Sequence, residues 1–301
     1  MELGELRAML DRHARADMTT AIDGVLISKV EQPTPPSASM SGTVMALIAQ
    51  GAKTIMLGDR VYEYRAGQYL VASVDLPVTG NFTEASPQAP ALGVGLILNP
   101  ATVAELLLRA APGDLPPVTG GVPCGLVVSD APKALFDAVL RLVRLLDEPR
   151  DATVLAPLVK REILWRLVTG EQGAAVRQLG LADSSLSHVA RAVRWIREHY
   201  AESFKVEEVA RLSGLSVSAF YRNFQAVTAM SPIQFQKQIR LQEARLLLAT
   251  HPHDITGVGT RVGYDSASQF SREYRRQFGA PPSQDAVRLR GLRREAAPAL
   301  V

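Results

Sequence analysis

The chain has 301 residues, 47% hydrophobic and 21% charged, which is the composition of a globular protein long enough for two domains. No run of about eighteen uncharged apolar residues occurs and the first residues lack the apolar segment of a secretory signal, so we expect a cytoplasmic protein rather than a membrane or secreted one. The single cysteine, Cys124, excludes an internal disulfide and a zinc site built on several thiolates.

The first part of the chain is predicted to form β-strands. Short segments rich in β-branched and aromatic residues alternate with Gly, Asp, Asn and Pro, which is typical of a small barrel or sandwich. Gly58 predicts a hairpin turn, because glycine accepts positive φ, and the prolines of 32–39 predict a loop. The predicted strands are residues 24–30, 43–50, 52–58, 60–67, 68–74, 77–85, 92–99 and 123–128.

Two helices are predicted next, over 133–146 and 153–168, ending before Pro149 and at Gly170. Each is more apolar than packing on one small barrel requires, so one stripe is predicted to face a second copy in a homodimer. The predicted organisation is a sensor and dimerisation domain over 1–170, a linker over 171–185 and a third segment over 186–301.

Positive charge is concentrated in the last part of the chain. Residues 184–301 carry 17 Lys and Arg against 10 Asp and Glu, a net charge of +7, whereas residues 1–183 have a net charge of −4. A polyanion such as a nucleic acid binds where positive charge is in excess. The asymmetry therefore favours a nucleic-acid partner for the C-terminal part.

The same C-terminal part contains an internal repeat, residues 206–224 and 255–274. Each copy has a short helix with a small residue, a glycine that permits a turn, a Ser that caps a second helix, and an aromatic stripe with an arginine on the opposite face. This order predicts a helix-turn-helix, and two copies in one register favour DNA binding over a merely solvated charged surface. The matched residues are Ala210 and Gly259, Gly214 and Gly263, Ser216 and Ser266, Phe220 and Phe270, Arg222 and Arg272, and Phe224 and Tyr274.

A long helix is predicted between the copies, over 231–250. Ser231 is the expected cap, Pro232 the first helical residue, and the helix is expected to stop near His251 and Pro252. About nineteen helical residues span roughly 28 Å. Successive major-groove segments lie about 34 Å apart, so such a rod can hold two recognition helices in adjacent grooves.

Residues 226–248 and 262–282 resemble the AraC/XylS family of bacterial transcription regulators, and residues 49–87 resemble the sensor domain of one of its branches. The resemblance implies an α+β multidomain fold: a cupin-like β-barrel with a two-helix dimerisation segment, and an all-α domain with two helix-turn-helix motifs joined by a long helix. It also implies promoter DNA, RNA polymerase and a small-molecule effector as partners. Gly257 and Gly259 depart from the family pattern, where alanine-like residues are commoner.

Residue matching to the family assigns roles on the two recognition helices. Arg222 and Arg272 are the foremost candidates for base contacts, since a guanidinium can donate two hydrogen bonds to guanine, while phosphate contact is the alternative for each. The expected base-contacting residues are Ser218, Tyr221, Arg222, Ala267, Ser268, Gln269 and Arg272. The expected phosphate-contacting residues are Lys237, Arg240, Arg275 and Arg276, and the candidate effector-pocket residues are Tyr62, Tyr64, Tyr69 and Phe82, for which ordinary packing is the alternative.

An enzyme is the competing interpretation. No histidine lies between residues 20 and 130, so a His-rich metal site in the barrel is not expected, and no cofactor is expected either. His251 and His253 are interpreted as part of a turn, and Cys124 as a small buried residue rather than a thiol sensor. We therefore expect a transcription regulator, an activator in preference to a repressor, with a cupin-type enzyme or a DNA-repair protein that carries an AraC-like module as the alternative.

Overall fold

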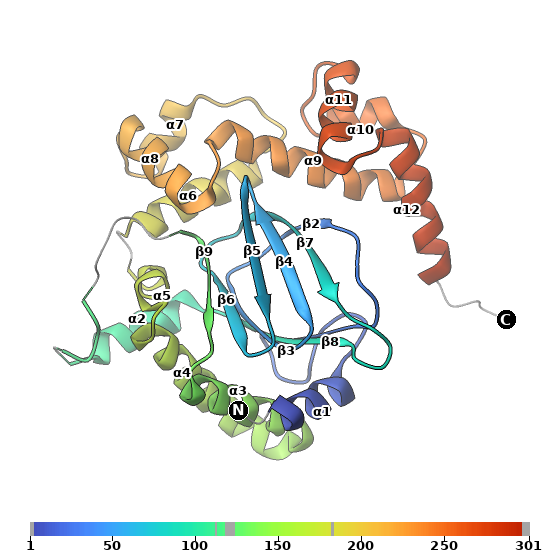
Figure 1. The fold of residues 1–301 in the computed structure, drawn as a ribbon. Coiled ribbons are helices and arrows are strands. Elements are labelled where there is room, and N and C mark those ends of the chain that lie inside the picture. The colour runs from blue at the N-terminus through green and yellow to red at the C-terminus, as the bar shows by residue number, and fades with distance from the viewer. Residues whose placement is uncertain (1–2, 112, 118–123, 182–183, 297–301) are drawn as a thin grey trace. The chain divides into compact units, whose positions relative to one another are not determined.

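The computed structural model describes residues 3–111, 113–117, 124–181 and 184–296 (Figure 1). The chain divides into two compact units. One comprises Met1–Arg191 and Ser218–Met230, and the other comprises Ala192–Val217 and Ser231–Val301. The segment Ser218–Met230 contains the first predicted recognition helix, and it groups with the first unit.

The strands of the first unit form two antiparallel sheets in its described residues. The larger sheet has the order β1-β8-β3-β6-β9 and the smaller has the order β2-β7-β4-β5. The strands of the larger sheet are β1 (Val25–Val30), β8 (Ala91–Ile97), β3 (Val44–Gln50), β6 (Gln68–Ala72) and β9 (Leu126–Asp130). Those of the smaller sheet are β2 (Ser37–Met40), β7 (Pro77–Glu84), β4 (Ala52–Leu57) and β5 (Arg60–Arg65).

The predicted strand pattern is confirmed, with two differences. Leu57 pairs with Arg60 across a two-residue turn, and Gly58 has a φ of 62°, so the predicted hairpin is present. The loop predicted over 32–39 is wrong at its end, because Ser37–Met40 forms β2 along the edge of β7. Strand β9 begins at Leu126 rather than at 123, and residue 123 lies outside the described residues.

Helices cover the outer face of the larger sheet. They are α1 (Leu3–His13), α2 (Pro100–Arg109), α3 (Lys133–Arg144), α4 (Pro149–Thr169) and α5 (Gly173–Leu179), with a 3₁₀ turn over Leu145–Asp147 after α3. The two predicted helices are confirmed as α3 and α4, while α1 and α2 were not predicted. Pro149 begins α4 at its first turn, where the missing N–H of proline costs no hydrogen bond.

The core of the first unit lies between that sheet face and the helices. Alternate strand residues such as Leu47 on β3 and Val94 on β8 join Leu10, Phe136 and Ile163 of the helices in one apolar cluster. Each of these side chains is at most 3% exposed. The intervening strand residues therefore face the other way, toward the smaller sheet, whose strand β5 contacts β3, β6 and β9.

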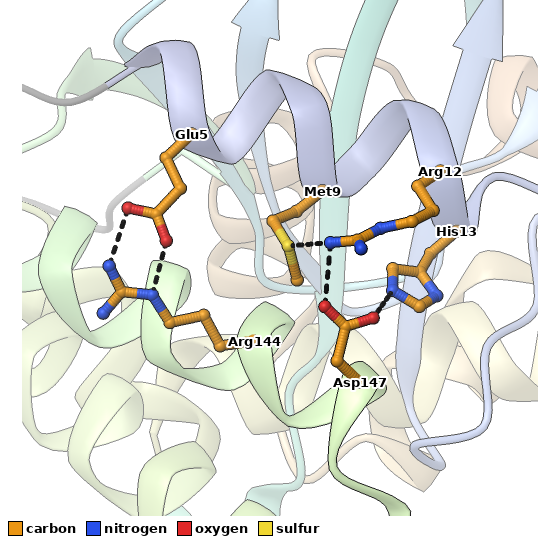
Figure 2. Close-up of polar contacts among 6 residues, drawn as sticks. All are labelled: Glu5, Met9, Arg12, His13, Arg144 and Asp147. Carbon is orange, nitrogen blue, oxygen red and sulfur yellow. Dashed lines mark hydrogen bonds and ion pairs between the residues drawn. The ribbon is translucent and has the colours of Figure 1, made fainter.

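Helix α1 is fastened to α3 and the following turn by ion pairs (Figure 2). The guanidinium of Arg144 donates two hydrogen bonds of 2.7 Å to the carboxylate of Glu5, and this contact lowers the pKa of Glu5. Asp147 accepts a hydrogen bond of 2.8 Å from Arg12 and lies 2.8 Å from His13 Nε2. Helix α1 is thus held to the rest of the first unit by polar contacts as well as by its buried leucines.

The remaining helices carry the repeat. They are α6 (Ser185–Glu198), α7 (Val206–Leu212), α8 (Val217–Thr228), α9 (Pro232–Thr250), α10 (Ile255–Arg261), α11 (Ala267–Phe278) and α12 (Pro282–Ala296). The long helix is confirmed as α9, which has 19 residues, Pro232 at its first position and a capping box between Ser231 and Gln234. Among the described residues, no helix combines the length and apolar composition that crossing a membrane requires.

Candidate nucleic-acid interface

The turns that follow α7 and α10 have the same hydrogen bonds. After α7, Gly214 N–H donates to Arg211 O and Leu215 N–H donates to Ala210 O, each at 3.0 Å. After α10, Gly263 N–H donates to Thr260 O at 2.9 Å and Tyr264 N–H to Gly259 O at 3.0 Å. Gly214 and Gly263 have φ values of 76° and 90°, so both turns need glycine. The predicted repeat is therefore present in the backbone.

The second copy explains its unusual glycines. A Cβ on Gly259 would lie 3.0 Å from the ring of Phe270, so the small residue lets α11 pack closely on α10. Gly257 leaves room for the carboxylate of Asp254, which caps α10 by accepting from Gly257 N–H at 2.9 Å. The predicted cap on α11 is also confirmed, since Ser266 Oγ accepts from Gln269 N–H at 3.3 Å.

The two recognition helices bury one face and expose the other. The buried aromatic residues are Phe220 and Phe224 on α8, and Phe270 and Tyr274 on α11, all with no exposed surface. The seven residues predicted to contact bases are all exposed: Ser218, Tyr221 and Arg222 on α8, and Ala267, Ser268, Gln269 and Arg272 on α11. Each helix therefore exposes polar side chains, including one arginine at the matched position.

Arg240 is held by hydrogen bonds within its own unit, and its phosphate contact stays a prediction. Its guanidinium donates to backbone carbonyls of Tyr200 (2.6 Å), Glu202 (3.0 Å) and Gly263 (2.7 Å), and more weakly to that of Ala201 at 3.3 Å. These contacts involve Nε, Nη1 and Nη2, and they leave one N–H of Nη1 outside them. Arg240 ties the loop after α6 and the turn after α10 to α9.

The other predicted phosphate-contacting residues lie at or near the exposed side of the second copy. Arg275 and Arg276 in the last turn of α11 are exposed. Lys237 on α9 is half-buried and pairs with Glu273 of α11 at 3.5 Å. Glu273 also accepts a hydrogen bond of 2.9 Å from the hydroxyl of Tyr264, so this carboxylate is held within the helix-turn-helix.

In the first unit, the structure separates the four candidate pocket residues. Tyr62 and Tyr64 on β5 and Phe82 on β7 share the face of the smaller sheet that looks toward the larger sheet. Tyr69 on β6 instead belongs to the apolar cluster under the helices, so it does not share a wall with the other three. A cavity of about 250 Å³ in this unit is lined by Ile22, Leu145, Lys160 and neighbouring residues, and it includes none of the four candidates.

Cys124 is half-buried and has polar neighbours, so its interpretation as a buried apolar residue is wrong. Its Sγ lies 3.3 Å from Arg60 Nη1 and 3.2 Å from the hydroxyl of Tyr62. Burial, together with the contact to Cys124, raises the pKa of Tyr62 to about 12, against the opposite effect of Arg60. No group of three or more His, Cys, Asp or Glu side chains within the described ranges is arranged to hold a metal ion.

The sequence analysis did not identify Lys53 as a residue on the inward face of the smaller sheet. Lys53 lies on β4 between Tyr64 and Phe82, on the inward face of the smaller sheet. The sequence "AKTIML" indicates this position. Lys53 is two and four residues before the apolar Ile55 and Leu57, so the three side chains share one face of the strand.

Comparison with known proteins agrees with this architecture. The family described as "AraC-type transcriptional regulator N-terminus" matches residues 21–175, and a family described as "Helix-turn-helix domain" matches residues 209–286. The transcriptional activator RhaS of Salmonella schwarzengrund is 27% identical over 153 residues, which are 50% of this chain and 54% of RhaS. The virulence regulon transcriptional activator VirF of Yersinia enterocolitica is 28% identical over 166 residues, 54% of this chain and 59% of VirF.

The chain thus spans somewhat more than half the length of these curated relatives. Among solved structures, an apo variant of ToxT from Vibrio cholerae strain SCE256 superposes with a TM-score of 0.53 at 11% identity, covering 90% of this chain and all of that one. This likeness concerns the fold alone. The family match over residues 21–175, joined to a duplicated helix-turn-helix, shows that the chain belongs to the AraC family of transcriptional regulators.

Proposed function

We propose that this protein is a sequence-specific DNA-binding transcription regulator, and that it acts as an activator. The observation that supports this most is the pair of equivalent turns, each followed by a helix with a buried aromatic stripe and an exposed arginine. The 19-residue helix α9 between the copies has the length needed to serve two adjacent major grooves. The matched relatives RhaS and VirF are named as activators.

The first unit is proposed to bind a small-molecule effector and to act without catalysing a reaction. The matched relatives are regulators, and the Tyr62, Tyr64 and Phe82 side chains supply an aromatic wall between the sheets. An activator of this kind works in the cytoplasm and contacts RNA polymerase at the promoter, so we include both in the proposal.

We also propose a homodimer formed through the first half of α4. Val154, Leu155 and Leu158 on this helix are 66%, 41% and 60% exposed. Residues four apart lie on one face of a helix, so Val154 and Leu158 form an uncovered apolar stripe. Val154→Lys combined with Leu158→Lys should convert a dimer to a monomer in sedimentation velocity. A wild-type chain that sediments only as a monomer at micromolar concentration would contradict the dimer.

DNA binding is tested by sequencing the genomic fragments that the full chain retains, followed by binding measurements on the enriched site. Arg222→Ala and Arg272→Ala should each flatten preference at one base position, with a loss of about 1 to 3 kcal/mol. Arg65→Ala, on the outer face of the barrel, is the matched control. If the retained fragments shared no sequence, the proposal of sequence-specific DNA binding would be wrong. If both arginine variants kept the wild-type site preference, Arg222 and Arg272 would not contact bases.

A further inference from the structure

Glu273 lies on recognition helix α11, one helical turn after Gln269, which is expected to contact a base. Residues four apart in sequence lie on the same side of a helix, so the two side chains can meet. Gln269 is exposed, whereas the side chain of Glu273 is only 18% exposed. Glu273 therefore lies beside the exposed face of α11 rather than at its centre.

Two groups outside α11 hold the Glu273 carboxylate in place. The Tyr264 hydroxyl donates a hydrogen bond of 2.9 Å to Oε2. Tyr264 is 6% exposed, and burial together with this hydrogen bond raises its pKa, so the hydroxyl stays a donor at neutral pH. The ammonium group of Lys237 on α9 lies 3.5 Å from the other oxygen, Oε1. The carboxylate is therefore fixed both from the turn before α11 and from the long helix.

The amide of Gln269 is oriented by the same carboxylate. Its Nε2 donates to Glu273 Oε1 at 3.5 Å, which is a long hydrogen bond. The bond contributes little energy, but it decides which way the amide faces. A carboxylate only accepts hydrogen bonds, so the opposite amide orientation would place two oxygens against each other. Gln269 is thus held with its NH₂ group toward Glu273 and its own Oε1 away from it.

An amide held in this orientation matches one base. Adenine presents N7 as an acceptor and its N6 amino group as a donor in the major groove, and glutamine pairs with them through Nε2 and Oε1. Nε2 carries two N–H groups, so one can donate to Glu273 while the other donates to the base. A side chain that is ordered before DNA arrives also loses less conformational entropy on binding.

The first copy of the repeat has different side chains at these positions. A methyl group offers no hydrogen bond to a base, and leucine has no hydroxyl with which to hold a carboxylate. Where the second copy has Gln269, Glu273 and Tyr264, the first copy has Ala219, Asn223 and Leu215.

We propose that Glu273 is a positioning residue for base recognition by the second copy: it orients the amide of Gln269, and Gln269 contacts an adenine in the major groove. Glu273 itself stays on Tyr264 and contacts no base. The inference deepens the proposed function, because it rests on α11 lying against base edges and names the base that one position of the DNA site requires.

Two other roles for Glu273 predict different behaviour. A carboxylate that touched a base directly would select cytosine, whose N4 amino group is a donor. A carboxylate that only supported Tyr264 would affect the stability of the helix-turn-helix and would leave sequence preference unchanged.

The test is selection from a randomised duplex library with the full chain, followed by affinity measurements on duplexes that differ at one base pair. The wild type should prefer adenine at one position by at least about fivefold, the lower limit for a bidentate amide contact. Gln269→Ala should remove that preference. Glu273→Ala should reduce it by about two- to fivefold, as expected for one lost hydrogen bond, and should leave the other positions unchanged.

A double substitution separates positioning from direct contact. In the Gln269→Ala background, adding Glu273→Ala should cause no further change at that position, because a positioning residue acts only through the side chain that it orients. Tyr264→Phe is the matched variant for stability. It removes the same hydrogen bond as Glu273→Ala and should likewise lower the unfolding temperature, but it leaves the carboxylate to Gln269 and should retain most of the adenine preference. Asp265→Ala, an exposed carboxylate before α11, should change neither property.

The inference would be overturned if Gln269→Ala altered no adenine position, if the adenine preference persisted in full in Glu273→Ala, or if Tyr264→Phe lost as much of it as Glu273→Ala. A cytosine preference that disappeared in Glu273→Ala would instead assign this residue a direct base contact. Each of these results leaves a wild-type chain that selects a sequence, so the proposed function would stand. A wild-type chain that selected no sequence would contradict the proposed function and this inference together.

Discussion

The two helix-turn-helix copies close their turns with the same backbone hydrogen bonds but differ in the side chains around them. Where the second copy has Tyr264 after the turn, the first copy has Leu215. The repeat also extends into the helix after each copy, where Pro232 of α9 corresponds to Pro282 of α12. In that register, the first copy has Phe224 and Phe235 where the second has Tyr274 and Asp285.

At the two positions where the first copy has phenylalanines, the second copy has a hydrogen-bonded pair. The Tyr274 hydroxyl donates a hydrogen bond of 2.8 Å to Asp285. The same carboxylate accepts a hydrogen bond of 2.9 Å from Arg245 Nε of α9. Asp285 is 2% exposed, and the guanidinium of Arg245 lies 4.8 Å above the ring of Phe278. The same backbone turn is thus combined with apolar residues at these positions in the first copy and with a buried polar pair in the second. In the second copy, α11 depends on buried polar contacts with α9 and α12.

The largest expected effect comes from breaking that buried network. Asp285→Ala should destabilise the second unit by about 3 to 5 kcal/mol, because it leaves Arg245 and the Tyr274 hydroxyl without their buried partner. Hydrogen exchange of α11 and α12 peptides, together with thermal unfolding, would measure the loss. Asp265→Ala, on the exposed side before α11, is the control. A loss below about 1 kcal/mol would show that the apolar contacts alone hold the second copy.

Arg240→Met should cost about 2 to 4 kcal/mol, since hydrogen bonds from a charged donor to several carbonyls are lost. Exchange should rise in residues 199–204 and 259–266, while Arg261→Met should leave both segments unchanged. The salt dependence of DNA binding gives a second readout. If Arg240 contacts a phosphate, Arg240→Met should reduce the salt slope by about one. If Arg240 only holds the backbone carbonyls, the substitution should leave the slope unchanged.

The turns of the repeat and Arg240 show which features the sequence could predict and which it could not. The turns, caps and long helix follow from local rules, because Gly214, Gly263, Ser266 and Ser231 act on backbone within a few residues of themselves. Arg240 looks like any exposed arginine in sequence. Its carbonyl partners come from loops 23 to 40 residues away, and no local pattern reports such contacts.

In the first unit, too, local features could be predicted and long-range contacts could not. Strand periodicity predicted the sheets, yet β2 was missed because the prolines before it are typical of a loop, and its pairing with β7 is a long-range contact. Tyr69 and Tyr64 are both aromatic residues on strands and look equivalent in sequence. In the structure, Tyr69 faces the helices from the larger sheet, whereas Tyr64 faces the larger sheet from the smaller one. Lys53 was overlooked because a lysine on a strand normally marks the solvent face.

Alkaline pH should affect the second copy through tyrosines that the first copy lacks. Burial, with the hydrogen bond to Asp285, raises the pKa of Tyr274, and burial with Glu273 raises that of Tyr264. Above about pH 10 the unfolded chain loses these protons while the folded chain keeps them, so the free energy of unfolding falls as pH rises, by up to about 1.4 kcal/mol per pH unit and group.

Tyr274→Phe restores the residue type of the first copy and should reduce this slope between pH 10 and pH 11 in urea unfolding. Tyr221→Phe, on the exposed face of α8, should leave the slope unchanged. Equal slopes for the wild type and Tyr274→Phe would mean that the buried hydroxyl titrates as it does in the unfolded chain.

The smallest expected effect concerns the residue that ends each recognition helix. Gly279 after α11 has a φ of 77°, and Ala229 after α8 has a φ of 57° at the matching position. A left-handed conformation costs a residue with a Cβ about 1 kcal/mol relative to glycine. No atom lies within 4 Å of the Cβ position of Gly279, so Gly279→Ala should cost about 1 kcal/mol through the backbone alone. Ala229→Gly relieves the same strain but removes a methyl group that is 7% exposed, worth about 0.8 kcal/mol, so chemical denaturation should show a much smaller change. If both substitutions cost the same, the strain at Ala229 is not what separates the two copies.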